Sequence, residues 1–361
     1  MTRDTSVYLD AVRFAAALAV LLSHAEDGWA PGLLPGVSHL GLAAVAVFFV
    51  LSGFVIGYAV DTKERDAASY AINRAARLYS VVVPCLVLTV ALDTLGRHLG
   101  LAAYRLDWTR QWGAAREPLD AAASLLFVNE VWGWGLLPGS NVPFWSLGYE
   151  APYYLVFGFA AFLPGAWGLA AGGLALLAAG PGIAALFPLW LLGWGTYRAC
   201  QRAVLPRQAA RALWCAAAAL WLGSEALRWH YHLGWDGPIR RGWPVLWHFY
   251  AVGVPFAVSI LAVRHAAVSL AVVAGAVRWC AGATFTLYLL HYPVGFFLNA
   301  VVPAGWPAWG RWVAIVPTTL VIAFAFAHVS ERRKAAWRRA IVGAVAWLNF
   351  RPRTPASLGM P

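Results

Sequence analysis

The feature that most constrains this chain is the recurrence of apolar runs that approach twenty residues in length. A helix needs about 20 such residues to span the hydrocarbon core of a bilayer. Only helices and closed barrels satisfy their backbone hydrogen bonds in lipid, and these runs lack the alternation of polar and apolar residues that is typical of a barrel strand. With 61% hydrophobic and 12% charged residues in a chain of 361, the sequence predicts an all-α fold, a polytopic transmembrane helical bundle.

The apolar runs and the basic clusters together predict the topology. Runs that fit a span fall at 7–24, 37–60, 78–96, 150–164, 167–180, 183–199, 209–223, 243–263, 267–280, 284–301 and 311–329. Basic residues cluster at 63–77, 198–211 and 332–339, and the positive-inside rule places all three clusters in the cytoplasm. Five apolar runs separate the second basic cluster from the third. Two clusters on the same side of a membrane must, however, be separated by an even number of spans. The short run 267–280 is the weakest, so we expect about ten spans and two cytoplasmic termini.

No break in composition marks a second globular domain. We expect a membrane-embedded domain over 1–330 and a basic cytoplasmic tail over 331–361, with an interfacial helix against anionic lipid at 332–339. Topology accounts for the net charge of +11, so nucleic-acid binding is not expected. The four cysteines occur singly, with neither metal-ligand nor disulfide spacing, and no metal is expected.

The first apolar run contains two polar side chains, Arg13 and His24. Each is costly inside a bilayer and therefore requires a partner or a water-filled cavity. They are eleven residues apart, so a helix would project both from one face, about 16 Å apart along its axis. Such a face can line a path across the membrane. In the simpler alternative, Arg13 snorkels to the interface and His24 is a solvated residue at a helix end.

Small and basic residues follow in the next segments. Ser52 and Gly53 lie within the second run, where small residues allow close helix packing, and packing alone explains them. Arg74 and Arg77 are three residues apart and would share a helix face, where two guanidinium groups can grip phosphates. Two arginines beside a membrane are also ordinary topology signals.

Two later stretches carry further candidates. Ser146 and Glu150 stand four residues apart, so their side chains would share a helix face at a membrane mouth. The carboxylate could orient a histidine or accept a hydroxyl proton, whereas the simpler alternative is a helix start with Ser146 as its cap. His291 lies inside a late run just before Pro293 and is either functional or bonded to a freed backbone carbonyl.

Taken together and in order, these motifs resemble the acyltransferase-3 family, bacterial membrane enzymes that O-acylate carbohydrates and some antibiotics. The motifs are Arg13 with His24, Phe48-Phe49 with Ser52-Gly53-Phe54, Arg74 with Arg77, Phe144-Trp145-Ser146-Leu147 with Glu150, and Tyr288-Leu289 with His291 and Pro293. One departure is Ser80, where the family often has proline. The resemblance extends over nearly the whole chain.

The resemblance implies an integral protein of the bacterial inner membrane that uses an acyl-CoA donor from the cytoplasmic side. The acceptor would be a hydroxyl of a carbohydrate or of a secondary metabolite, and acetyl is the default acyl group. His24 would be the essential catalytic residue and Arg13 its paired cation, while Arg74 and Arg77 would bind the donor's phosphates. His24, oriented by Glu150, would act as general base or as nucleophile.

A proton-coupled transporter or flippase is the alternative function, with the intramembrane Arg, His and Glu residues as its relay. Such proteins commonly carry broken helices in two matching halves. The sequence shows neither paired Gly/Pro-broken helices of that kind nor an internal repeat, which favours the acyltransferase.

Overall fold

The computed structural model describes residues 1–105, 117–230, 243–266 and 270–349, and every regular element within these ranges is helical. The all-α prediction is therefore confirmed. The long helices are α1 (Arg3–His24), α2 (Leu40–Thr62), α3 (Ala67–His98), α6 (Leu147–Phe162), α7 (Gly165–Ala179), α8 (Pro181–Arg202), α9 (Arg207–His230), α10 (Trp243–Ala266), α12 (Thr284–Val301), α13 (Ala308–Ala327) and α14 (Lys334–Asn349). The short ones are η1 (Ala25–Trp29), η2 (Ala102–Arg105), α5 (Glu117–Leu125), η3 (Val131–Gly133), η4 (Val142–Ser146), η6 (Ala271–Val273), α11 (Ala274–Ala281) and η7 (Glu331–Arg333).

Five helical segments of the described residues are long and apolar enough to cross a membrane: Arg3–Trp29, Leu40–Thr62, Ala67–His98, Leu246–Ala266 and Ala308–Trp347. A sixth is added if η6 and α11 form one broken span with α12, across a bend of 51°. The predicted count of about ten spans is not confirmed by length and hydropathy. One reason is that α6 and α7, with 16 and 15 residues, are shorter than a typical span of about 20.

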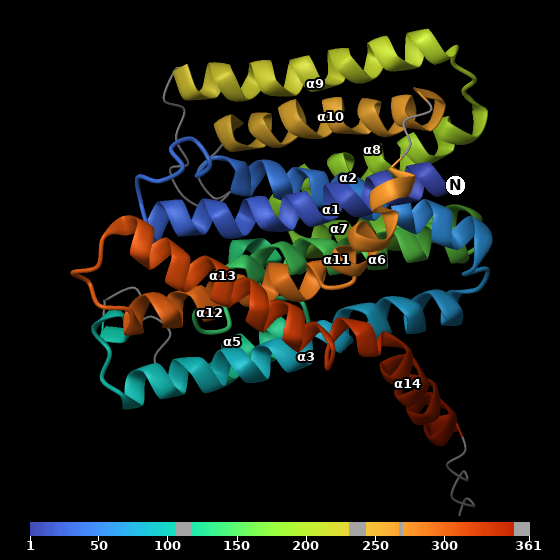
Figure 1. Cartoon of the computed structure of the whole chain (residues 1–361). Coiled ribbons are helices and arrows are strands. Elements are labelled where there is room, and N and C mark those ends of the chain that lie inside the picture. The colour runs from blue at the N-terminus through green and yellow to red at the C-terminus, as the bar shows by residue number, and fades with distance from the viewer. Residues whose placement is uncertain (106–116, 231–242, 267–269, 350–361) are drawn as a thin grey trace, which may run out of the picture.

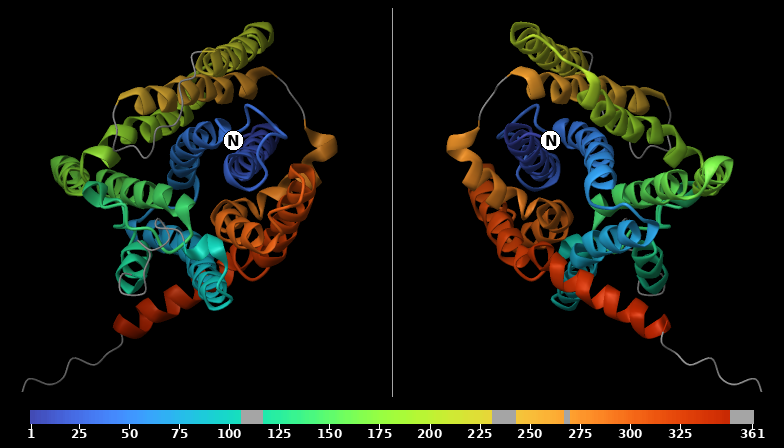
Figure 2. Two further views of the ribbon diagram at one scale, coloured as in Figure 1. Left: turned by 90° about the vertical axis from the view of Figure 1, so that its left-hand side faces the viewer. Right: turned by 90° about the vertical axis from the view of Figure 1, so that its right-hand side faces the viewer.

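The long helices run side by side, and α14 leans away from the bundle (Figure 1). Seen along the helices, α1 lies in the interior of the bundle (Figure 2). It contacts α2 and α10 as well as α11 and α12. Most residues of the helix that carries Arg13 and His24 are buried or half-buried against its neighbours, and both of these side chains are half-buried. Contact with protein is the setting that charged residues in a membrane require.

Helices α2 and α8 cross very closely at a reciprocal pair of glycines. A Cβ atom on Gly53 would lie 1.9 Å from the Trp190 carbonyl oxygen, and one on Gly193 would lie 1.9 Å from the Val50 carbonyl oxygen. Neither position can hold a side chain without separating the backbones. The interpretation of Gly53 as a packing residue is therefore confirmed.

The three basic clusters gather at one end of the bundle. Arg198, near the end of α8, lies 3.6 Å from Asp61 at the end of α2, and Arg338 of α14 donates to Asn73 of α3 at 2.9 Å. Arg211, at the start of α9, donates to the carbonyl of Ala266, where α10 ends. The chain thus leaves this end in α9, returns in α10, leaves in α12 and returns in α13. Because α11 has only eight residues and is not a pass of its own, four passes lie between the second and the third basic cluster, an even number as their shared end requires.

Candidate active site

Three cavities follow one another along the interior of the bundle, and we name them the vestibule, the central cavity and the outer cavity. The vestibule is lined by Asp10, Arg13, Arg77, Ser80, Arg278, Ala281, Gly282, Phe285, Glu331 and Lys334. It shares Arg13, Arg77 and Phe285 with the central cavity. The central cavity in turn shares Val45 and Tyr288 with the outer cavity, which contains His24. The volumes are about 280, 80 and 380 Å³ in that order.

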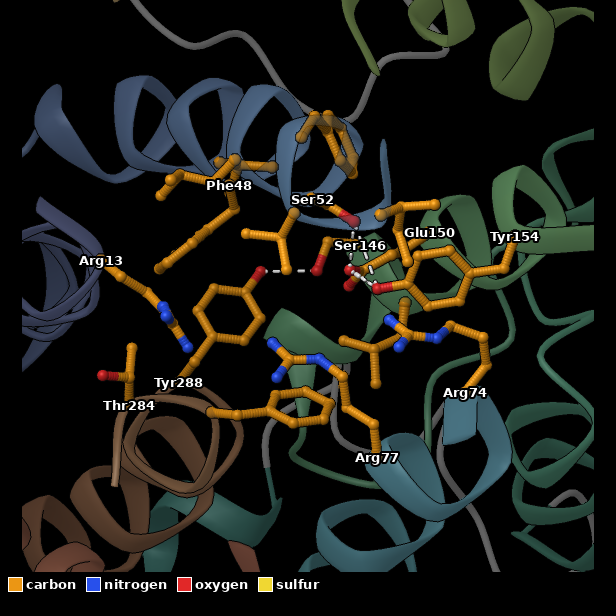
Figure 3. Close-up of a pocket in the computed structure, with 17 residues that line it drawn as sticks. Arg13, Phe48, Ser52, Arg74, Arg77, Ser146, Glu150, Tyr154, Thr284 and Tyr288 are labelled. Atoms are coloured by element: carbon orange, nitrogen blue, oxygen red, sulfur yellow. Dashed lines mark hydrogen bonds between the residues drawn. The ribbon is translucent and has the colours of Figure 1, made fainter. Parts of the chain in front are cut away.

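The Glu150 carboxylate lies at the centre of a hydrogen-bond network in the central cavity (Figure 3). It lies in the first turn of α6, and its Oε1 accepts a hydrogen bond from the Ser52 hydroxyl at 2.8 Å. Trp190 Nε1 donates to the same hydroxyl at 3.1 Å, and the Tyr154 hydroxyl donates to Glu150. Tyr154 follows Glu150 by four residues and so shares its helix face. The carboxylate is thereby held in one position by groups from α2 and α6.

Ser146 contributes a hydroxyl to the other wall of the central cavity. Its Oγ lies 2.7 Å from the Tyr288 hydroxyl, and Tyr288 also donates to the Pro143 carbonyl oxygen at 3.2 Å. Ser146 precedes α6, but its side chain makes no capping hydrogen bond to that helix. Ser146 thus occupies the predicted cap position of α6 without capping it through its side chain, and the hydroxyl instead joins η4 to α12.

His24 lies at the junction where α1 changes to the π-helical turn η1. Its ring stacks on His291 with centroids 5.3 Å apart and meets Tyr292 edge-on at 4.8 Å. His291 Nδ1 donates to the Leu287 carbonyl oxygen, one turn earlier on α12, at 3.2 Å. The structural alternative had expected the carbonyl that Pro293 frees, which is that of Leu289, so the observed bond is a different one. The Nε2 of His291 is buried and has no hydrogen-bond partner within the described residues.

The structure does not bring Glu150 to His24. The carboxylate lines the central cavity and is bonded to Ser52 and Tyr154, whereas His24 lines the outer cavity against aromatic rings. Tyr288 lies between the two because it lines both cavities. The predicted orientation of His24 by Glu150 is therefore not seen as a direct contact.

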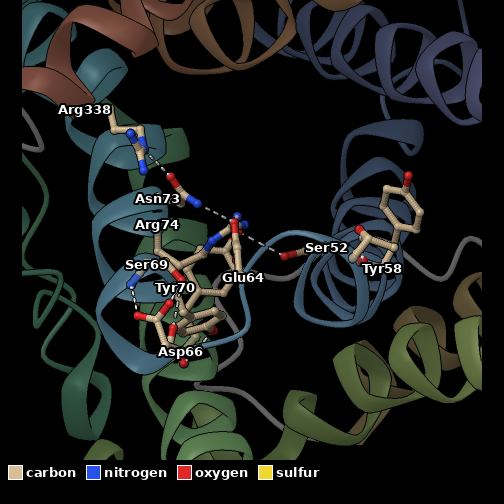
Figure 4. Close-up of polar contacts among 11 residues, drawn as sticks. Ser52, Tyr58, Glu64, Asp66, Ser69, Tyr70, Asn73, Arg74 and Arg338 are labelled. Carbon is tan, nitrogen blue, oxygen red and sulfur yellow. Dashed lines mark hydrogen bonds and ion pairs between the residues drawn. The ribbon is translucent and has the colours of Figure 1, made fainter.

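The arginines of the motifs differ in their partners. Arg74 pairs with the buried carboxylate of Glu64 at 2.6 Å, and Asn73 donates to the same oxygen at 3.1 Å (Figure 4). Arg77 lies with its guanidinium carbon 5.8 Å from the centre of the Phe285 ring. Arg13 pairs with Asp10, one turn earlier on α1, at 2.7 Å. All three line the central cavity, and only Arg13 and Arg77 also line the vestibule.

The start of α3, which carries Arg74 and Arg77, is set by a cap. The Asp66 side chain accepts a hydrogen bond from the backbone N–H of Ser69 at 2.8 Å, and the Ser69 hydroxyl donates to Asp66 as well (Figure 4). These hydrogen bonds hold the pKa of Asp66 below its ordinary value. The capped helix then projects both arginines into the same interior space.

The comparison with known families decides what these cavities belong to. Residues 6–328 match the acyltransferase-3 family, described as an acyltransferase domain. The chain belongs to the acyltransferase-3 family.

Two curated relatives match parts of this acyltransferase-3 chain. Acyltransferase MdmB of Streptomyces mycarofaciens is 30% identical over 156 residues, which are 41% of this chain and 37% of the relative. The O-acetyl transferase of Shigella phage Sf6 is 34% identical over 85 residues, which are 23% of this chain and 25% of the relative. The matches thus span between about a quarter and two-fifths of the relatives' lengths. No solved structure matches the chain.

The loop that leads to Ser146 depends on a buried carboxylate that the sequence analysis missed. Asp93 of α3 accepts hydrogen bonds from the Ser140 N–H at 2.7 Å and from the Ser140 hydroxyl at 2.6 Å. The neighbouring Gly139 has φ +57°, and a Cβ there would lie 2.1 Å from Asp93 Oδ2. The sequence did contain a signal for this role, because Asp93 is an acidic residue near the end of the apolar run 78–96.

The outer cavity also contains polar residues that the sequence analysis missed. Besides His24, it is lined by Ser23, Asp27, His39 and Arg228. Arg228 lies in the last turn of α9, and its guanidinium contacts His39 Nδ1 at 3.2 Å. Burial and the charge of Arg228 hold the pKa of His39 below its ordinary value. Within the described residues, no cluster of three or more His, Cys, Asp or Glu side chains is arranged to hold a metal ion.

Proposed function

We propose that this protein is an integral membrane O-acyltransferase that moves an acyl group from acyl-CoA to an acceptor hydroxyl. The observation that carries the proposal is that the vestibule and the outer cavity, at the two ends of the series of three cavities, have different chemistry. The vestibule presents a group of cations, and the outer cavity presents the imidazole of His24. A donor that is anionic at one end and reactive at the other suits such a row.

The vestibule suits the phosphates of CoA because positive charge exceeds negative charge on its walls. Its cationic side chains are Arg13, Arg77, Arg278 and Lys334, against the carboxylates of Asp10 and Glu331. The Glu331 carboxylate accepts hydrogen bonds from the N–H groups of Phe285 and Thr286 at 3.0 and 3.1 Å, so it also caps α12. Guanidinium groups bind phosphate oxygens bidentately. Arg77 is the residue that we expect to contribute most, because Arg74 already pairs with Glu64.

The reaction would take place where the central cavity meets the outer cavity. Neutral His24 would take the proton of the acceptor hydroxyl while the hydroxyl oxygen attacks the thioester carbonyl carbon. The C–O bond forms, the C–S bond breaks, and the departing thiolate takes the proton back from the imidazolium. In the covalent variant, His24 attacks the thioester carbon and the CoA thiolate leaves. The acceptor hydroxyl then attacks the acyl carbon, the C–N bond to His24 breaks, and the hydroxyl proton passes to the thiolate. The hydroxyl groups of Tyr288 and Ser146, which lie between Glu150 and His24, would orient the thioester.

The topology that we propose has about ten crossings and two cytoplasmic termini, with the vestibule facing the cytoplasm. The gathering of the three basic clusters at the vestibule end supports this orientation. Acyl-CoA would then enter from the cytoplasm and the acceptor from the other side of a bacterial inner membrane. We expect the acceptor to be a carbohydrate or a secondary metabolite. We expect the acyl group to be acetyl, in keeping with the name of the phage relative, an O-acetyl transferase.

Thioester turnover tests the proposal directly. Membranes carrying the wild type, His24→Ala or the control His98→Ala would be given acetyl-CoA, and CoA release would be followed with and without candidate glycans. His98 is an exposed histidine in the last turn of α3 and lines none of the three cavities. We expect release by the wild type and the control and a loss of about 10²–10⁴-fold in His24→Ala. Absence of release by the folded wild type with several acyl-CoA donors would instead favour the transporter.

A further inference from the structure

The outer cavity receives a buried cation from an unexpected helix. Arg228 lies in the last turn of α9, is only 7% exposed, and lines the cavity that contains His24. In the bundle, α9 packs on α10 and forms an outer layer (Figure 1). A charged side chain that extends inward from an outer layer to a cavity is costly to bury and is therefore a candidate for ligand binding.

We propose that Arg228 binds an oxyanion, a carboxylate or a phosphate, on the acceptor, so that the protein acylates acidic hydroxyl compounds. This inference rests on the proposed acyltransferase function, because it assigns the acceptor to the outer cavity. It identifies Arg228 as a residue that determines specificity rather than as one that performs the chemistry.

Two imidazoles hold the guanidinium of Arg228 in place. Its NH1 lies 2.8 Å from His248 Nε2, and its NH2 lies 3.2 Å from His39 Nδ1. Arginine has donors only, so both ring nitrogens accept and both bonded nitrogens are unprotonated. A neutral imidazole orients a cation without cancelling its charge. Glu225, one turn earlier on α9, adds negative charge to this cluster, but its Oε1 lies 3.7 Å from His248 Nε2 and it does not line the cavity.

The remaining polar groups of the outer cavity suit the hydroxyls of the same molecule. Asp27 and Ser23 lie within three residues of His24 along the chain and line the same cavity. The Asp27 carboxylate accepts hydrogen bonds from hydroxyl groups and repels a second anion, which favours an acceptor with one acidic group. With about 380 Å³, the cavity is within the range of 300–1,000 Å³ that is typical of small-molecule sites. A sugar acid or a sugar phosphate meets these requirements.

The test compares acidic and neutral probes on the purified full-length protein with acetyl-CoA. The probes are methyl glucuronide, glucose 6-phosphate and the neutral methyl glucoside, and transfer is measured as acetylated product. We expect the wild type to show at least a tenfold higher kcat/KM for one acidic probe than for methyl glucoside. The better of the two acidic probes distinguishes a carboxylate from a phosphate.

Variants locate this preference. Arg228→Gln should lower the ratio of acidic to neutral kcat/KM at least tenfold, and Arg228→Lys should retain part of it. The control Arg97→Gln removes an exposed arginine from the last turn of α3 and should leave the ratio unchanged. Equal use of acidic and neutral probes by the wild type would overturn the inference even if Arg228→Gln failed to fold. So would an unchanged ratio in Arg228→Gln. Absence of CoA release with every probe would instead count against the acyltransferase function itself.

Discussion

His24 and His291 stack with their ring centroids 5.3 Å apart and their planes 22° from parallel. The contact joins α1 to α12, and it gives the proposed catalytic imidazole a flat aromatic support. His291 does not line any of the three cavities, so we expect it to position His24 rather than to contact the substrate.

Two replacements of His291 distinguish the role of its flat ring surface from the role of its ring nitrogens. His291→Phe retains a flat ring, and we expect it to keep most of the thioester turnover, within about tenfold. His291→Ala removes the ring, and we expect kcat to fall about 10²-fold because a small displacement of a catalytic group is costly. Acyl-CoA KM should change little in either variant. Equal losses in kcat for the two variants would show that a nitrogen of His291, not its ring surface, is required.

The crossing of α2 and α8 should be intolerant of any side chain. Gly53→Ala places a Cβ atom 1.9 Å from the Trp190 carbonyl oxygen, so we expect a loss of about 1–3 kcal/mol or more in unfolding free energy. The matched control is Gly173→Ala in α7, where no atom lies within 4 Å of the new Cβ. Thermal unfolding in detergent measures both variants. An unchanged Tm for Gly53→Ala would contradict the close crossing.

Arg74 and Arg77 should fail in different ways, although they belong to one motif. Glu64 is buried at 3% exposure and pairs with Arg74, so Arg74→Gln leaves a buried carboxylate unpaired and should cost about 3–5 kcal/mol of stability. The double variant Glu64→Gln/Arg74→Gln should recover part of that loss. Arg77→Gln should instead raise the KM for acyl-CoA about tenfold. Stability is read from thermal unfolding and KM from CoA release, and a reversed pattern would refute the assignment.

Asp93 should control the loop that carries Ser146. Asp93→Asn weakens the two hydrogen bonds from Ser140, and bonds of this charged kind contribute about 1.5–3 kcal/mol each. We expect both Tm and kcat to fall, because the loop sets the position of the Ser146 and Tyr288 hydroxyls. Thr94→Ala, at the exposed neighbouring position, serves as the control. A normal kcat with a lowered Tm would limit Asp93 to a structural role.

The helices themselves were accessible from the sequence. Each predicted apolar run overlaps a helix of the structure, although 267–280 corresponds only to the short η6 and α11 and its residues 267–269 lie outside the described residues. The positions of Arg13 and His24 on one side of α1 were likewise predicted, and both side chains line the same row of cavities. Hydropathy and helical periodicity are local properties, so a single sequence reveals them.

The partners of the polar residues were not accessible in this way. Ser52 and Glu150 are 98 residues apart in the chain, and Arg228 and His39 are 189 apart. Spacing within one helix favoured Ser146 as the neighbour of Glu150, whereas packing of α2 against α6 made Ser52 its hydrogen-bond donor. Arg228 belongs to none of the sequence motifs, and only the packing of α9 on α10 brings it to the cavity that contains His24.

The sequence alone thus determined that this is a helical membrane protein and which residue types bear chemistry, because the cost of polar groups in lipid is read directly from composition and spacing. Only the tertiary structure decided how the motifs divide among a basic vestibule, a carboxylate-centred middle and a histidine-containing outer cavity. The physical reason is that a cavity wall is assembled from several helices, and the contacts that join them are set by side-chain packing between distant parts of the chain.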